Sequence, residues 1–146
     1  MVRLLPIVFL LFSGSLGCSN VNPSDLAGTW TIDDESRRYL PPEVQKASSK
    51  VVLDANGTFV ASDMPGMFLA HPGLVRVESG RGNWKLVSTN GAQQIQLNFY
   101  EISGQEEIKV PYGTQINVSR GIIAITLFYF LGGPDEGRRV DLDKEK

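Results

Sequence analysis

The sequence predicts an all-β domain, either a sandwich or a small antiparallel barrel, and three observations support this. Eight to ten short segments alternate apolar and polar side chains, which is the period of a half-buried strand. Two Asn-Gly pairs, at residues 56–57 and 90–91, separate such segments and are the strongest short hairpin signal. Helical periodicity is scarce, and turn-linked strands at near-regular spacing favour an antiparallel arrangement over βαβ units.

The expected elements follow one another along the chain. Strands are expected at residues 27–32, 50–54, 58–61, 83–87, 94–99, 107–110, 114–118, 122–130 and 138–142. One or two helical turns are expected at residues 34–40, ending at the two prolines that follow, and a second short helix at 43–48. Residues 63–80 form the longest irregular stretch, which could contain a strand at 75–78. The side chains expected to point inward are Trp30, Phe59, Trp84, Ile95, Leu97, Phe99, Ile108, Val110, Ile116 and Val118.

Composition limits the classes of function. The chain has 146 residues, the size of one domain, and its net charge of −2 predicts no nucleic-acid partner. A single cysteine excludes a disulfide framework, a single histidine excludes sites that need two, and no Gly-x-Ser-x-Gly elbow is present. The acidic residues 33–35 fit the first turn of a helix better than a calcium loop. We therefore expect no enzyme, no cofactor and no metal site.

Residues 1–17 have the pattern of a secretory signal peptide. Arg3 precedes an apolar run at residues 4–12, and small residues dominate positions 13–17. The apolar run has nine residues, too few for a membrane-spanning helix, which needs about 20. The sequence therefore predicts export of the chain.

Residues 15–18, Ser-Leu-Gly-Cys, resemble the bacterial lipobox, in which a signal peptidase cuts before a lipidated cysteine. The resemblance implies acylation of Cys18, with 18–25 as lipidated cysteine and polar tether and 26–146 as the folded domain. It also implies a lipid-anchored protein of the bacterial cell envelope, and Ser19 after the cysteine implies the outer membrane, facing the periplasm. The alternative is a plain secretory signal followed by a spare thiol.

Gly28-Thr29-Trp30, at the start of the first long expected strand, resembles the Gly-x-Trp motif of lipocalins and their calycin relatives. The resemblance implies a meander barrel of eight to ten strands with one or two short helices. In that family the tryptophan closes one end of the barrel and an arginine of the last strand packs over it, here Arg138 or Arg139. The chain looks like the small lipocalin-like lipoproteins of bacteria, which implies a non-enzymatic barrel that binds a small apolar ligand.

The ligand contacts expected on this interpretation are Met64, Met67, Phe68 and His71, in the long loop. Met and Phe side chains adapt to varied apolar shapes, so the loop would act as a gate over the barrel mouth. The alternative for the loop is packing onto its own barrel.

The alternative function is a structural or interaction protein of the envelope, with a filled barrel and no ligand. Its outer face near residues 122–130 would then contact an envelope protein partner. That segment is apolar on both faces of a strand, so its outer face needs cover from a short helix, the long loop or a partner.

Overall fold

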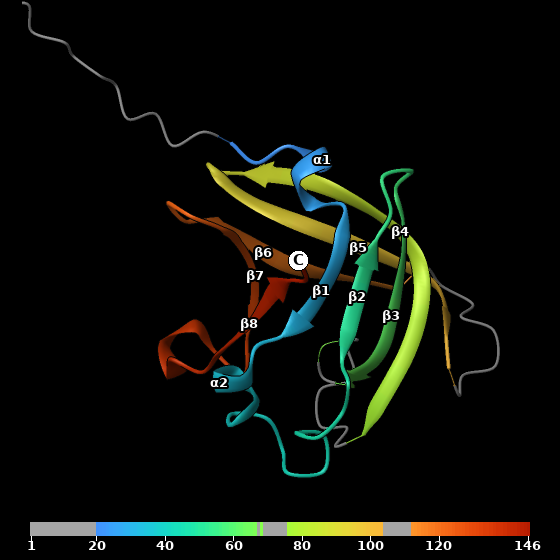
Figure 1. Ribbon diagram of the computed structural model, residues 1–146, viewed down its shortest axis with the longest axis vertical. Coiled ribbons are helices and arrows are strands. Elements are labelled where there is room, and N and C mark those ends of the chain that lie inside the picture. Colours follow the sequence, from blue (N-terminus) through green and yellow to red (C-terminus); the bar gives the residue numbers. More distant parts are fainter. Residues whose placement is uncertain (1–19, 67, 69–75, 104–111) are drawn as a thin grey trace, which may run out of the picture.

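The computed structural model describes residues 20–66, 68, 76–103 and 112–146, and these form a closed barrel of eight antiparallel strands (Figure 1). Each strand pairs with its neighbours in the sequence, and the first strand closes the barrel by pairing with the last. The strands are β1 (Gly28–Ile32), β2 (Lys50–Leu53), β3 (Thr58–Pro65), β4 (Val77–Thr89), β5 (Ala92–Ile102), β6 (Tyr112–Arg120), β7 (Ile125–Phe130) and β8 (Arg139–Lys144). The helical elements are α1 (Pro23–Leu26), α2 (Asp34–Arg37) and the 3-10 turn η1 (Pro134–Glu136). The predicted all-β meander barrel is confirmed.

Both Asn-Gly hairpins form as predicted. Asn90 and Gly91 join β4 to β5 with φ of 51° and 81°, and a two-residue hairpin of this kind needs positive φ at both positions. Gly57, with φ of 85°, completes the turn between β2 and β3, where its N–H donates to the Asp54 carbonyl at 3.0 Å. These turns fix the register of the strands that they join.

The largest difference from the expected elements is the length of β4, which begins at Val77 instead of residue 83. Glycines at positions 80 and 82 interrupt the alternation of apolar and polar side chains, so the sequence pattern predicts a loop there. In the barrel, Gly82 allows a close approach of β5: a Cβ there would lie 1.9 Å from the Asn98 carbonyl oxygen. Glycine in a strand often marks such a close contact or a barrel corner. Of the stretch expected to be irregular, residues 63–65 belong to β3 and residues 77–80 belong to β4.

Two other expectations also change, and a third is not tested. Residues 42–46 form turns and residue 47 a bend, where a second short helix was expected at 43–48. Residues 121–124 form the turn before β7, because the Gly121 N–H donates to the Ala124 carbonyl at 2.8 Å. The expected strand at 107–110, with Ile108 and Val110, lies outside the described residues.

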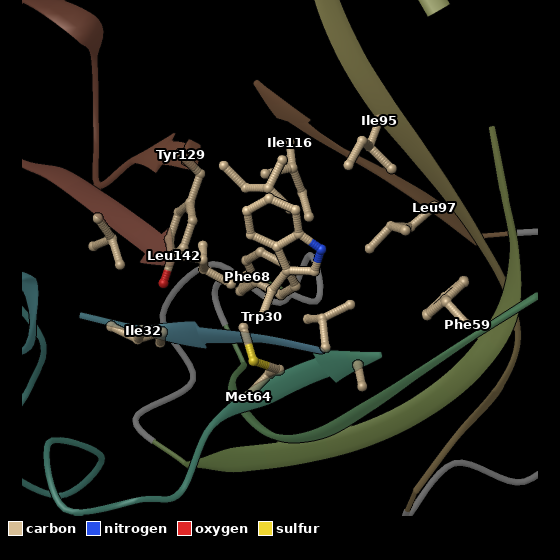
Figure 2. Packing of buried hydrophobic residues seen from close by; sticks show 14 of the residues in the cluster. Trp30, Ile32, Phe59, Met64, Phe68, Ile95, Leu97, Ile116, Tyr129 and Leu142 are labelled. Carbon is tan, nitrogen blue, oxygen red and sulfur yellow. The ribbon is translucent and has the colours of Figure 1, made fainter. Parts of the chain in front are cut away.

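The barrel interior is filled by side chains from every strand (Figure 2). Trp30 lies in the middle of the cluster, and the rings of Phe59 and Phe99 meet edge to face at 4.9 Å. The inward residues with no accessible surface are Trp30, Val51, Ala61, Met64, Ile95, Leu97, Ile116, Leu127, Val140 and Leu142. A side chain without accessible surface borders no space that a water molecule could enter. The predicted inward positions that the structure describes are buried, except that Val118 is only half-buried.

Different segments cover the two ends of the barrel. At the end that we call the α1 end, the buried Leu26 lies under the barrel and its carbonyl accepts a hydrogen bond from Trp30 Nε1 at 2.9 Å. The buried Val21 joins this cover, so the expected tether contributes to the folded body from residue 21. At the opposite α2 end, Leu40 and Val44 are buried.

Trp30 is therefore the side chain whose loss should cost most. We expect Trp30→Ala to lower the free energy of unfolding by about 3–5 kcal/mol, because it removes a large buried ring and leaves a cavity. Urea denaturation followed by circular dichroism measures this. The control Tyr100→Ala, at a largely exposed site on β5, should change stability by no more than about 0.5 kcal/mol. Equal losses in the two variants would contradict a core position for Trp30.

Candidate functional site

The structure describes two of the four expected ligand contacts, and both belong to the core. Met64 has no accessible surface, and Phe68 is buried with its ring edge against Tyr129 at 4.9 Å (Figure 2). The Phe68 N–H donates to the Pro65 carbonyl at 2.8 Å, which turns this side chain into the barrel after β3. Met67 and His71 lie outside the described residues. Met64 and Phe68 thus act as packing residues in this state of the protein.

A gap opens in the barrel wall beside Phe68. The ladder between β6 and β7 ends at Asn117 and Phe128, and beyond that point the described strands pair on their other sides only. A cavity of about 200 Å³ lies at the gap, lined by Phe68, Thr114, Gln115, Asn117, Tyr129 and Phe130. Ligand pockets typically enclose about 300–1,000 Å³, so this space is small for a bound molecule.

Tyr129 carries a buried hydroxyl that accepts and donates no hydrogen bond among the described residues. Burial raises the pKa of Tyr129 well above its ordinary value, since the phenolate would lose its hydration. The phenol is therefore neutral at physiological pH. Nothing in the sequence pattern marked Tyr129, because an inward tyrosine in a barrel strand normally finds a partner.

Glu78 is a second buried polar residue that the sequence pattern did not reveal. It pairs with Met64 in the β3–β4 ladder, and residues opposite each other in a ladder share a face of the sheet. The exposed Arg76 donates to Glu78 Oε1 from Nη2 at 3.0 Å and from Nε at 3.3 Å. The positive charge of Arg76 thus compensates the negative charge of the buried Glu78 carboxylate at the α2 end.

A polar surface pocket lies between α2 and β8. Its volume is about 350 Å³, and its lining is Asp33, Glu35, Ser36, Arg38, Tyr39, Gly137, Arg139 and Asp141. Ser36 joins the two elements: its Oγ donates to Asp33 at 2.7 Å and accepts from the Asp141 N–H at 2.9 Å. Asp33 also accepts from the Ser36 N–H, so it caps α2 as predicted.

The lining of this pocket carries three carboxylates, of Asp33, Glu35 and Asp141, and two guanidinium groups, of Arg38 and Arg139. Partial burial and the nearby carboxylates of Asp33 and Asp141 raise the pKa of Asp143 above its ordinary value. Among the described residues, no group of three or more His, Cys, Asp or Glu side chains is arranged to hold a metal ion. The pocket is a structural joint between α2 and β8.

The expectation that Arg138 or Arg139 packs over Trp30 is wrong. Arg139 lies over the Phe128 ring at 3.9 Å on the outside of the barrel, and Arg138 pairs with Glu136. Among the described residues, the cation that lies near the indole is Lys144, with Nζ 5.8 Å from the ring centre. Lys144 pairs with Trp30 in the ladder because β8 ends where β1 begins, and the register of these two strands determines that Lys144 is the residue opposite Trp30.

The α1 end presents the most exposed large apolar side chains in the described part of the chain. Ile122 and Ile123, at the apex of the β6–β7 turn, are 105% and 98% exposed. We call this pair the isoleucine tip. The sequence pattern placed both residues in a strand, since the run from 122 to 130 is almost continuously apolar.

Comparisons with protein-family models, with curated proteins and with solved structures found no match to this chain. Within the described ranges, no helix has the length and apolar character needed to cross a bilayer. The fold itself defines the class of protein: a small eight-stranded meander barrel whose described interior positions are packed.

The unpaired hydroxyl of Tyr129 predicts a stabilising substitution. An unsatisfied buried hydroxyl costs about 1–3 kcal/mol, so Tyr129→Phe should raise the free energy of unfolding by about 1 kcal/mol at pH 7. The folded-state pKa is raised, so the wild type should also lose stability as the pH rises above about 10, where the unfolded tyrosine ionises.

Urea denaturation at pH 7 and pH 11 tests both expectations. Tyr129→Phe should lack the part of the alkaline loss that Tyr129 causes, whereas the control Tyr100→Phe, at an exposed site, should behave as the wild type. A destabilised Tyr129→Phe would indicate that the hydroxyl has a partner.

Proposed function

We propose that the chain is an exported lipoprotein of the bacterial cell envelope, anchored by acylated Cys18, whose barrel is a non-enzymatic interaction domain and holds no ligand. The packed interior is the observation that favours an interaction domain over a barrel that binds a ligand inside. A ligand inside the barrel would have to displace side chains such as Trp30 and Met64, which have no accessible surface.

The support for the anchor comes from residues 1–18. A charged start, a short apolar run and a cysteine after small residues fit export followed by acylation. The net charge of −2 gives no attraction to anionic lipid, so acyl chains on Cys18 would hold the protein at the membrane. On this proposal, the acylated protein lies at the outer membrane of the cell envelope.

The support for an interaction role lies on the outside of β7 and β8. Phe128 and Phe130 meet edge to face at 5.6 Å, and Arg139 lies over Phe128. Aromatic and arginine side chains are enriched at protein interfaces, where they supply much of the binding energy. A partner in the envelope would use this face, which includes part of the apolar segment at 122–130.

A second candidate is a small apolar ligand at the gap between β6 and β7. The unpaired Tyr129 hydroxyl and the cavity of about 200 Å³ favour it, because a guest could hydrogen-bond to the phenol. Phe68, which lines this cavity, would then contact the ligand, as the sequence suggested.

Replacement of Cys18 tests the anchor. We expect Cys18→Ser to move the protein from the membrane fraction to the soluble periplasmic fraction, or to leave an uncleaved precursor, because no acyl chain can be attached. Fractionation with mass measurement of the product is the readout, and Ser19→Ala is the matched control that should stay with the membrane. Unchanged membrane association of Cys18→Ser would overturn the anchor.

Replacement of Phe68 separates the packed barrel from the ligand container. We expect Phe68→Ala to lower the free energy of unfolding by about 3–5 kcal/mol, since it empties a buried site. The matched control Phe130→Ala, at a half-buried ring on the outer face, should lose less. The wild type should show no saturable uptake of an apolar fluorescent probe. Two results together would favour a ligand-binding barrel: saturable uptake of the probe by the wild type, and loss of that uptake in a Phe68→Ala variant that is as stable as the wild type.

A further inference from the structure

The turn between β6 and β7 has an unusual composition for a turn. Residues 121–124 are Gly-Ile-Ile-Ala, whereas turns normally carry Gly, Pro, Asn, Asp or Ser. The other hairpin turns at the α1 end, at residues 54–57 and 90–91, carry Asn-Gly. The isoleucine tip therefore adds no turn-forming side chain and exposes two of the largest aliphatic side chains at one point.

The chain enters the barrel beside this turn. Arg120, the last residue of β6, donates from Nη1 to the Asn20 carbonyl at 3.2 Å and lies 3.6 Å from the Asp25 carboxylate. Gln93 on β5 forms two hydrogen bonds with the backbone of Val21. Its Oε1 accepts from the Val21 N–H at 2.8 Å, and its Nε2 donates to the Val21 carbonyl at 2.9 Å. Figure 1 shows the first described residues and the β6–β7 turn on the same side of the barrel. The position of Asn20 is thus fixed next to the isoleucine tip.

The anchor proposed above is close to that point. Cys18 precedes Asn20 by two residues, and a fully extended chain spans about 3.3–3.6 Å per residue. The Cα atom of Cys18 therefore stays within about 7 Å of the Cα atom of Asn20. Acyl chains on Cys18 would bring the bilayer surface to the α1 end.

We propose that the isoleucine tip inserts into the same bilayer that holds the acyl chains of Cys18, so that the barrel stands with its α1 end on the membrane. This inference rests on the proposed function, because the acylated cysteine selects the occupant. Apolar side chains gain by leaving water for the acyl boundary, and a second contact beside the anchor fixes the orientation of the barrel. The α2 end, with the charged pocket between α2 and β8, then faces away from the membrane.

Arg120 suits the boundary that this orientation creates. Its side chain is 40% exposed at the base of the turn, one residue before the turn begins. Arginine at such a boundary keeps its aliphatic stem against apolar surface and its guanidinium among headgroups. The same residue that holds Asn20 would thus lie at the level of the lipid phosphates.

A fluorescent probe on the tip tests the inference. Cys18 is the only cysteine and acylation removes its thiol, so Ile123→Cys in the acylated full chain offers one labelling site. The protein is labelled with an environment-sensitive thiol reagent and reconstituted in vesicles of phosphatidylethanolamine and phosphatidylglycerol, with or without brominated acyl chains as quenchers. Tyr100→Cys, exposed on β5 towards the α2 end, is the matched control.

We expect bromine to reduce the emission of the probe at position 123 by about half or more, and to leave the probe at position 100 almost unchanged. Equal, weak quenching at both positions in vesicle-bound protein would overturn the inference while the anchor stands. A probe at 123 that is shielded from water but unquenched, in protein that has dimerised, would also overturn it in favour of a second copy. A chain that carries no acyl group on Cys18 and stays in solution would overturn both the anchor and the inference.

A second variant checks that the effect belongs to the side chains. Ile122→Ser combined with the probe at position 123 should lower the quenching, because half of the tip becomes polar. Both sites are exposed, so the variants should fold as the wild type, which unfolding curves verify. Unchanged quenching in this variant would mean that the anchor alone holds the turn at the surface, which contradicts insertion of the tip.

Discussion

The indole of Trp30 lies at the middle of the barrel interior and donates from Nε1 to the Leu26 carbonyl, and this contact determines where the chain begins its path over the barrel. An eight-stranded barrel is just wide enough for side chains to fill, and one large ring at its centre leaves little room for anything else. The same hydrogen bond holds α1 against the barrel end. Val21 and Asn20, at the proposed membrane-facing end, are held in turn by Gln93 on β5 and Arg120 on β6.

The two barrel ends carry different structural features, although both expose charged side chains. The α1 end carries the isoleucine tip and the fixed entry of the chain. The α2 end carries the joint of Ser36 with Asp33 and Asp141, the buried Glu78 with its Arg76 partner, and a pocket lined with charged groups. In the orientation that we propose, the isoleucine tip would contact the bilayer and the pocket at the α2 end would face away from it.

The sequence predicted the features that depend on local pattern. Asn90-Gly91 and the alternation around Ile95 fix a hairpin without any knowledge of the rest of the chain, and Trp30 is buried as its motif implied. The sequence allowed a strand at 75–78 but left residues 79–82 of β4 in a loop, because Gly82 serves a close strand contact that only three-dimensional packing reveals. Alternation cannot detect such a contact.

Site features that depend on closure of the barrel were harder to predict. The cation near Trp30 is Lys144 and not an arginine, since the register of β1 against β8 decides which residue arrives there. The exposure of Ile122 was missed because apolar residues in a turn look the same in a sequence as the start of a buried strand. Tyr129 gave no signal, because a tyrosine hydroxyl without a partner becomes visible only when its surroundings are known.

The central claim is that the barrel is packed solid and works through its outer surface and its α1 end. Native mass spectrometry of the protein, extracted in mild detergent from the membrane of its own cell, tests this claim most directly. The account predicts the mass of the acylated polypeptide with no further small molecule released on gentle activation. A stoichiometric apolar molecule that dissociates on activation would contradict it.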